Sequence, residues 1–201
     1  MLRVGLTGGL ASGKSFVGRT LAELGCTLIQ ADLLGHQALL PGGGAYDAVL
    51  AEFGSDLLDG SGEIDRRKLA ALVFDFPDRL KMLNELVHPC VYQLGENLIE
   101  AAFAKDPTGI VVVEAAILIE TGSYKKFDRL VVAVCTEEQQ LERAAGRDGF
   151  TLEEAQARLR RQMPLAEKRK YADYVIDTSS TKENTVQQTR QVYESLRSIP
   201  V

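Results

Sequence analysis

Apolar runs rich in β-branched residues alternate along the chain with longer stretches in which apolar residues recur at helical spacing. Five of these runs are predicted to be buried strands, and they cover residues 2–7, 26–31, 109–115, 129–135 and 173–178. After the first run, the stretch "KSFVGRTLAELG" has helical spacing and ends at Gly25, a residue type favoured just beyond a helix. The pattern predicts an α/β fold with a parallel sheet of about five strands, and ligands in such folds bind at the carboxyl ends of the strands.

The spacing between the predicted strands is uneven, which indicates two helical excursions from the sheet. The gap between the second and third strands contains the loop "PGGGAY" and helical stretches around 45–54, 65–75 and 77–104. It is far longer than one crossover helix requires, so we expect an inserted helical subdomain. A second helical excursion, 151–173, separates the fourth predicted strand from the fifth.

Composition is that of one globular domain. The chain has 201 residues, of which 45% are hydrophobic and 25% charged, and this is enough to bury a sizeable core. The net charge of −5 is spread without long blocks of one sign, which argues against nucleic acid or a membrane surface as the main partner. The three cysteines have no CxxC spacing, and no apolar stretch approaches a membrane span. We expect a cytoplasmic protein from a reducing compartment.

The first predicted strand runs into the glycine-rich stretch "GLTGGLASGKSF". Gly8, Gly13, Lys14 and Ser15 fit the P-loop pattern G-x-x-x-x-G-K-[ST], in which backbone N–H groups surround nucleotide phosphates at the start of a helix. Lys14 is expected to reach the β- and γ-phosphates and Ser15 to bind Mg²⁺. An accidental match is expected in roughly one chain of this size in a hundred, but here the motif lies between a strand and a helix. The predicted phosphate-binding residues of this segment are Gly8, Gly9, Leu10, Ala11, Ser12, Gly13, Lys14, Ser15 and Phe16.

Acidic residues follow the second and third predicted strands. Asp32 is placed to accept a proton from an attacking hydroxyl, and a helix N-cap is an equally good interpretation of the same residue. His36, one helical turn later, suits a substrate contact or a structural role equally well. For Glu114 and Glu120 we favour structural roles, Glu114 as a buried acid at the strand edge and Glu120 as a helix cap or solvated group.

Two arginines, Arg143 and Arg147, lie one helical turn apart just before the second excursion. An arginine over the γ-phosphoryl group stabilises the charge that develops there during transfer. The basic residues that follow in 158–170 suggest a mobile lid, with a solvated helix face as the alternative.

Taken together, the motifs resemble the dephospho-CoA kinases over nearly the whole chain. The resemblance rests on "GLTGGLASGKS", "ADLLGHQAL", "LNELVHPCV", "VVVEAAILIETG", "LERAAGRDG" and "RQMPLAEKRKYADYVIDTS". It implies a P-loop kinase that uses ATP and Mg²⁺ to phosphorylate the ribose 3′-hydroxyl of dephospho-CoA, the last step of coenzyme A synthesis. The expected architecture is a core of about 1–33, 108–146 and 172–201, a helical acceptor-binding insertion of about 34–107 and a lid of about 147–171.

The resemblance also implies roles for single residues. Asp32 matches the general base, Arg143 the arginine that reaches the phosphates, and Lys14 the phosphate-binding lysine, and we take these three as catalytic. Arg147 and Gln162 match lid positions, and Asp177 lies in the segment associated with the adenine end. The expected ATP-binding set therefore includes Arg143, Arg147 and Asp177 as well as the loop, and the expected acceptor-binding residues are Asp32, His36 and Leu118.

Some residues depart from the family pattern, and other functions share part of it. Ala116 replaces a usual proline and Thr178 a common asparagine, which affects substrate contacts more than chemistry. A nucleoside or nucleotide kinase would share the P-loop, the aspartate and the lid. A GTPase-like switch is disfavoured, because "DLLG" follows the P-loop too soon and no N-K-x-D occurs. We expect a monomer or weak homo-oligomer that binds neither nucleic acid nor membranes.

Overall fold

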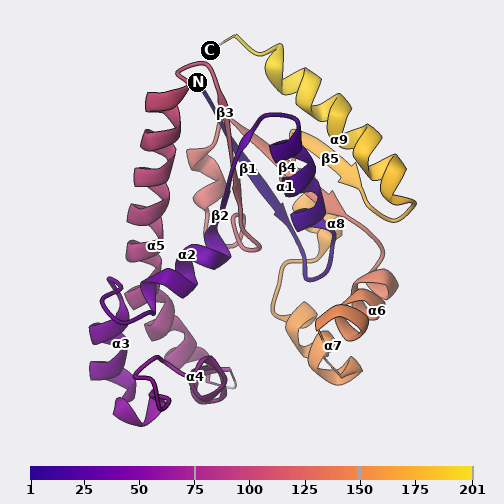
Figure 1. Cartoon of the computed structure of the whole chain (residues 1–201). Helices are drawn as coiled ribbons and strands as arrows, with labels where there is room; N and C mark the ends of the chain where they lie inside the picture. Colours follow the sequence, from indigo (N-terminus) through magenta and orange to yellow (C-terminus); the bar gives the residue numbers. More distant parts are fainter. Residues whose placement is uncertain (75, 149–150, 201) are drawn as a thin grey trace. The chain divides into compact units, whose positions relative to one another are not determined.

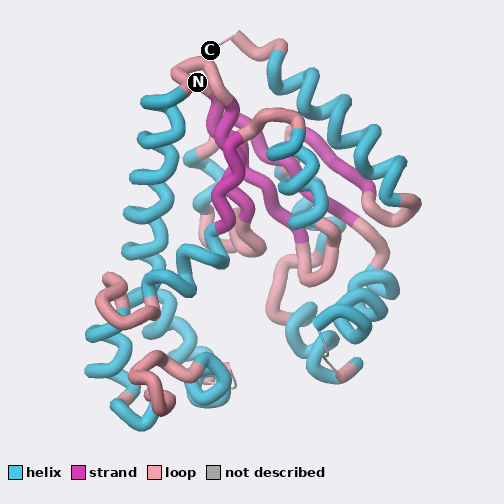
Figure 2. Tube along the Cα trace, viewed as in Figure 1, coloured by secondary structure: helices cyan, strands magenta, loops and turns pink. Residues whose placement is uncertain are grey.

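A computed structural model describes residues 1–74, 76–148 and 151–200 of the chain. For residues 147 and 148 it describes the backbone alone. The chain divides into two compact units, one formed by Met1–Gln30 with Ala101–Val201 and the other by Ala31–Glu100. Figures 1 and 2 trace the elements of both units. Each unit has its own buried apolar core.

The first unit is built on a parallel sheet of five strands. The strands are β1 (Leu2–Gly8), β2 (Thr27–Gln30), β3 (Ile110–Glu114), β4 (Arg129–Val134) and β5 (Tyr174–Asp177). Their order in the sheet is β2-β3-β1-β4-β5, and all four pairings are parallel. The five predicted strands are confirmed to within two residues at each end.

The side chains of β1 point alternately to the two faces of the sheet, which allows other elements to pack on both faces. Val4 and Leu6 join a fully buried cluster that includes Val17 of α1 (Lys14–Glu23) and Leu196 of α9 (Lys182–Arg197). Helices α1 and α9 contact each other on this face of the sheet (Figure 1). Because successive residues of a strand face opposite sides of the sheet, Gly5 and Thr7 face the side opposite α1 and α9.

The opposite face is covered by the connection after β3 and by part of the connection before β5. Leu118 and Phe127 approach Gly5 closely, and Thr7 donates a hydrogen bond to the carbonyl of Ala116. Lys168, in α8 (Leu165–Lys168), donates to the same carbonyl. The unit is therefore a three-layer α/β fold, as the sequence predicts.

The second unit is helical. Its helices are α2 (Ala31–Ala38), α3 (Tyr46–Phe53), α4 (Arg66–Val73) and the part of α5 (Pro77–Lys105) up to residue 100, with a short 3₁₀ turn η1 (Ser55–Leu57). Ala38, Val49, Leu57 and Leu69 are among its fully or nearly fully buried residues. Asp65 begins α4 as an N-cap, accepting hydrogen bonds from the N–H groups of residues 67 and 68. The helical stretches predicted in this region are confirmed.

The remaining elements surround β4 and β5. The chain continues from β4 into α6 (Glu137–Asp148), α7 (Leu152–Arg160), α8 and the 3₁₀ turn η3 (Arg169–Tyr171), and a further 3₁₀ turn, η2 (Ser123–Lys126), precedes β4. Pro164 precedes α8, so the second helical excursion consists of short pieces rather than one helix. Helix α9 was not among the predicted elements. In the described ranges, no helix has both the length and the apolar character needed to cross a bilayer.

Candidate active site

The turn between β1 and α1 is a tight backbone loop. A Cβ atom on Gly8 would lie 2.8 Å from the carbonyl oxygen of Ala133, so a side chain at this position has no space. Gly13, the N-cap of α1, has φ of +85°, which glycine adopts without the steric cost of a Cβ. Ala11 has φ of 52° and is the one non-glycine residue with positive φ in the part of the chain described. Non-glycine backbone of this kind is strained and persists where surrounding structure holds it.

The start of α1 suits an anion. Gly13 provides no side-chain cap, so the first turn of α1 keeps the partial positive charge of a helix N-terminus without a local oxygen to offset it. The hydroxyl of Ser12 is buried and has no hydrogen-bond partner within the described structure. A buried polar group without a partner is costly. Both features fit a loop that is completed by a bound phosphate group.

Glu114, at the carboxyl end of β3, contacts both functional side chains of the P-loop. Its Oε1 atom accepts a 2.5 Å hydrogen bond from Ser15 Oγ and lies 3.7 Å from Lys14 Nζ. Its Oε2 atom accepts a 3.0 Å hydrogen bond from Gln30 Nε2 at the end of β2. Glu114 is only 3% exposed, and its charge is balanced within the site by Lys14 and the two hydrogen bonds. The expectation of a buried acid at the strand edge is confirmed, but it missed the contact with the P-loop.

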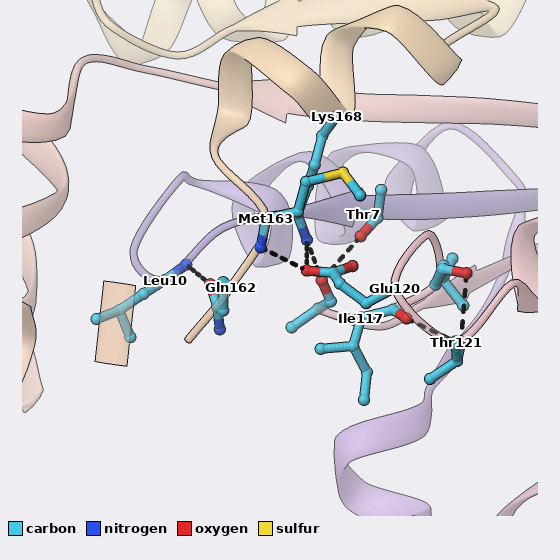
Figure 3. A network of polar contacts seen from close by, with 10 residues as sticks. Thr7, Leu10, Ile117, Glu120, Thr121, Gln162, Met163 and Lys168 are labelled. Atoms are coloured by element: carbon cyan, nitrogen blue, oxygen red, sulfur yellow. Dashed lines mark hydrogen bonds and ion pairs between the residues drawn. The ribbon is translucent and has the colours of Figure 1, made fainter. Parts of the chain in front are cut away.

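Two glutamine side chains hold the peptide groups of Leu10 in the P-loop. Gln140 Nε2 of α6 donates a 2.6 Å hydrogen bond to the carbonyl oxygen of Leu10. Gln162 Oε1, which follows α7, accepts a 2.8 Å hydrogen bond from the N–H of Leu10 (Figure 3). The loop is therefore bonded both to α6, at a residue before the predicted lid of about 147–171, and to Gln162 within that lid. No motif in the sequence indicates the role of Gln140.

An ion pair between a fully buried lysine and a partly exposed glutamate lies beside this loop (Figure 3). Lys168 Nζ is 2.8 Å from Glu120 Oε1 and donates a 2.5 Å hydrogen bond to the carbonyl of Ala116. The lysine side chain is 0% exposed and that of Glu120 is 22% exposed. Burial lowers the pKa of Lys168, while the hydrogen bond and charge of Glu120 act in the opposite direction. Lys168 therefore does not belong to a solvated helix face. In the described structure Glu120 caps no helix; it is exposed, as a solvated group would be, but it also bonds to Lys168 and to the N–H of Met163.

Arg143 approaches the P-loop through Thr178, the residue after β5. The two side chains are joined by a 3.1 Å hydrogen bond from Arg143 Nη1 to Thr178 Oγ1. Thr178 Oγ1 in turn donates to the carbonyl of Ser12 at 2.8 Å. Burial raises the pKa of the neighbouring Cys135 thiol, while the charge of Arg143 acts to lower it. A cation thus lies at the carboxyl ends of β4 and β5, close to the loop.

Other predicted residues of this unit have varied surroundings. Asp177 is exposed and its carboxylate accepts a hydrogen bond from the N–H of Ser179, so it shapes the turn after β5. Leu118 is 6% exposed and packs near Gly5. Arg147 falls in the last turn of α6, where its side chain lies outside the described residues.

Asp32 and His36 belong to the second unit. Asp32 is exposed in the first turn of α2, which begins one residue before it, so the N-cap interpretation is wrong. His36 is half-buried, and its Nδ1 atom lies 3.3 Å from Arg66 Nη1. Burial and the charge of Arg66 lower the pKa of His36, and the charge of Asp32 opposes this effect. A neutral imidazole can accept the hydrogen bond from Arg66.

Chemically, the first unit combines an uncapped helix N-terminus, a lysine, a hydroxyl and a carboxylate at one edge of a parallel sheet. Such an arrangement binds a nucleoside triphosphate and positions its terminal phosphate for transfer. Residues 2–184 match the sequence model of a family described as dephospho-CoA kinase. A dephospho-CoA kinase from Aquifex aeolicus is 40% identical over 200 residues, covering 100% of both chains.

Solved structures agree with this match. A Thermus thermophilus protein superposes with a TM-score of 0.82 at 29% identity, and a dephospho-CoA kinase from Campylobacter jejuni with 0.63 at 25%. In both cases the alignment covers 96% of this chain and 96% of the other. With its P-loop, five-stranded parallel sheet and full-length similarity, the chain belongs to the dephospho-CoA kinase family.

Proposed function

We propose that the chain transfers the γ-phosphoryl group of ATP to the ribose 3′-hydroxyl of dephospho-CoA, giving coenzyme A and ADP. The observation that carries this proposal is the P-loop in which Lys14 and Ser15 meet the buried carboxylate of Glu114, in a chain that the family matches from residue 2 to 184. We place the reaction in the cytoplasm.

The residues of the P-loop have separate tasks in this proposal. The N–H groups at the start of α1 bind the phosphates, and Lys14 neutralises charge on the β- and γ-phosphates. Gln140 and Gln162 keep the Leu10 peptide in place while the phosphates bind. A preformed loop stabilises the developing charge without having to reorganise during the reaction.

Ser15 and Glu114 fit a magnesium ion. Mg²⁺ prefers oxygen ligands, retains several waters and needs few protein groups. Across the described ranges, no three His, Cys, Asp or Glu residues gather as a metal cluster, so the ion would rely on this hydroxyl and carboxylate together with ATP. When bound, Mg²⁺ would offset charge on the phosphates. Gln30 would hold the carboxylate in place through its hydrogen bond to Oε2.

Asp32 would accept the proton of the 3′-hydroxyl as that oxygen attacks the γ-phosphorus. Its exposure leaves the carboxylate accessible to an acceptor, and positioned proton transfer contributes about 10²–10⁴-fold to a rate. Arg143 would stabilise negative charge on the phosphoryl oxygens. The helical insertion of about 34–107 would bind the acceptor through residues such as His36. The lid of about 147–171, including Arg147, would exclude water that competes with the hydroxyl.

The test is phosphoryl transfer by the purified protein with ATP and Mg²⁺, followed by mass analysis of the acceptor. Dephospho-CoA should gain one phosphoryl group, while a panel of nucleosides, nucleotides and shikimate should not. Asp32→Asn should lower turnover by about 10²–10⁴-fold while ADP affinity stays near that of the parent. ADP release that ignores dephospho-CoA would contradict the proposed acceptor, and turnover of Asp32→Asn within a few-fold of the parent would remove Asp32 as the base.

A further inference from the structure

Thr178 lies where three parts of the first unit meet. It directly follows β5 and is 6% exposed. Its hydroxyl is 2.8 Å from the carbonyl oxygen of Ser12 in the P-loop and 3.2 Å from that of Val134 at the end of β4. A hydroxyl has one proton to donate and two lone pairs, so this O–H is directed at backbone carbonyls and its lone pairs remain for a donor.

The donor is Arg143. Its Nη1 group donates to Thr178 Oγ1 at 3.1 Å, and its Nη2 group donates to the carbonyl oxygen of Thr178 at 2.7 Å. Two parallel bonds fix both the position and the orientation of a planar guanidinium. Arg143 is therefore held by one residue, through its side chain and its backbone.

The same side chain packs against the turn that begins α1. A Cβ atom on Gly13 would lie 2.9–3.0 Å from three atoms of the Thr178 side chain, so the threonine lies directly against the Gly13 backbone. Thr178 thus contacts the Ser12 carbonyl and lies against Gly13, where the P-loop becomes helix. A polar chain runs from the Ser12 carbonyl through the Thr178 hydroxyl to the Arg143 guanidinium.

We propose that Thr178 is a positioning residue of the nucleotide site, which sets the place of Arg143 relative to the P-loop and thereby the affinity for the nucleotide's polyphosphate. The inference rests on the proposed function in assigning Arg143 to the phosphates. The Nη2 bond to the Thr178 backbone survives any change of side chain, so the hydroxyl governs the fine placement of the guanidinium rather than its presence.

The experiment compares Thr178→Ala with the parent enzyme. Binding of ADP and of adenosine is measured by calorimetry, and kcat and KM are measured for ATP and for dephospho-CoA. Losing a hydrogen bond to a charged group should weaken ADP binding and raise KM for ATP about 10-fold. Adenosine affinity and KM for dephospho-CoA should stay within about two-fold. Thr178→Ser, which keeps the hydroxyl, should restore most of the ADP affinity.

A matched control is Thr189→Val in α9. Thr189 is also fully buried, but its hydroxyl donates to the carbonyl of Thr185 within the same helix. This variant loses a buried hydroxyl without touching the P-loop or Arg143, so its nucleotide affinity should equal that of the parent. If Thr178→Ala does not fold, Thr178→Val keeps the side-chain volume and takes its place.

A double-mutant cycle with Arg143→Met isolates the link between the two residues. In the Arg143→Met background, Thr178→Ala should weaken ADP binding by less than about three-fold, because the group it positions is gone. Additive losses, equal losses for ADP and adenosine, or ADP affinity unchanged in Thr178→Ala would each overturn the proposal. ADP binding does not require an acceptor. A parent protein that binds ADP but does not phosphorylate dephospho-CoA would therefore refute the proposed function and leave this inference standing.

Discussion

Removing either member of the Lys168–Glu120 pair should destabilise the protein, but by unequal amounts. Glu120→Ala leaves the ammonium of Lys168, whose side chain is 0% exposed, without its counter-charge. Removing one partner of a buried ion pair costs about 3–5 kcal/mol because an uncompensated charge stays behind. Lys168→Met leaves a carboxylate that is 22% exposed and can be hydrated.

The surrounding hydrogen bonds increase the difference in stability between Glu120→Ala and Lys168→Met. After Lys168→Met, the carbonyl of Ala116 still accepts a 3.1 Å hydrogen bond from Thr7, and methionine fills a similar volume. Lys168→Met should therefore lower the free energy of unfolding by about 1–2 kcal/mol, the net value of one or two hydrogen bonds. Glu120→Gln keeps an oxygen acceptor for Lys168 and for the N–H of Met163 but removes the charge. Glu120→Gln should lower the free energy of unfolding by an amount between those of the other two variants.

The assay is urea unfolding followed by circular dichroism and tyrosine fluorescence, with variants compared only where the slope of the free energy against urea is unchanged.

The pH dependence of stability supplies a second check. Because burial lowers the pKa of Lys168, the unfolded chain binds more protons than the folded one between the folded pKa and 10.5, and stability rises with pH across that window. Without Glu120 the folded pKa falls further, so the cost of Glu120→Ala should shrink as the pH is raised toward about 9.5. A Lys168→Met variant that is as unstable as Glu120→Ala, or a cost independent of pH, would refute the reasoning.

Three further predictions concern the P-loop, the metal and a half-buried histidine. Gly13→Ala should abolish measurable ADP binding by calorimetry, because φ of +85° and the 2.9 Å approach to Thr178 leave no place for a Cβ; near-parent affinity would contradict the described turn. Glu114→Gln should raise the Mg²⁺ concentration for half-maximal activity about 10-fold or more, since it retains an oxygen but loses the charge; an unchanged magnesium titration would remove Glu114 from the metal site. Burial lowers the pKa of His88 below 6.5, so the unfolded chain takes up more protons and stability falls as the pH drops below 6.5. Urea midpoints should fall less in His88→Gln than in the parent between about pH 7.5 and 5.5, and equal slopes would contradict this assignment.

Much of the fold could be predicted because it is encoded locally. Each strand is a compact β-branched run, and the P-loop is a contiguous motif between a strand and a helix. The role of Glu114 could not be predicted, since it depends on β3 pairing with both β1 and β2, an order that periodicity along the chain does not contain. A glutamate at the end of a strand was the available signal, and by itself it favours a structural role.

Long-range contacts also explain the other missed residues. Lys168 lies in a basic run that is typical of a solvated surface, yet tertiary packing buries this one lysine against Glu120 and Ala116. Thr178 attracted attention only as a departure from a family pattern, and its contact with Ser12 joins residues 166 positions apart. The periodicity of α9 is sufficient for a helix, with four residues buried on one face, although this helix was not among the predicted elements.

The strand order has a consequence for how the protein is made. Strand β1 has β3 and β4 as its two neighbours, so its first partner in the sheet is synthesised about 100 residues later. At translation rates of about 5–20 residues per second, the apolar N-terminal strand waits about 5–20 s without a partner. The helical unit of residues 31–100 is contiguous in sequence and carries its own core, so it can fold during this interval. The polar contacts of the P-loop are completed only when Thr178 has been synthesised, which makes nucleotide binding one of the last properties that the nascent chain acquires.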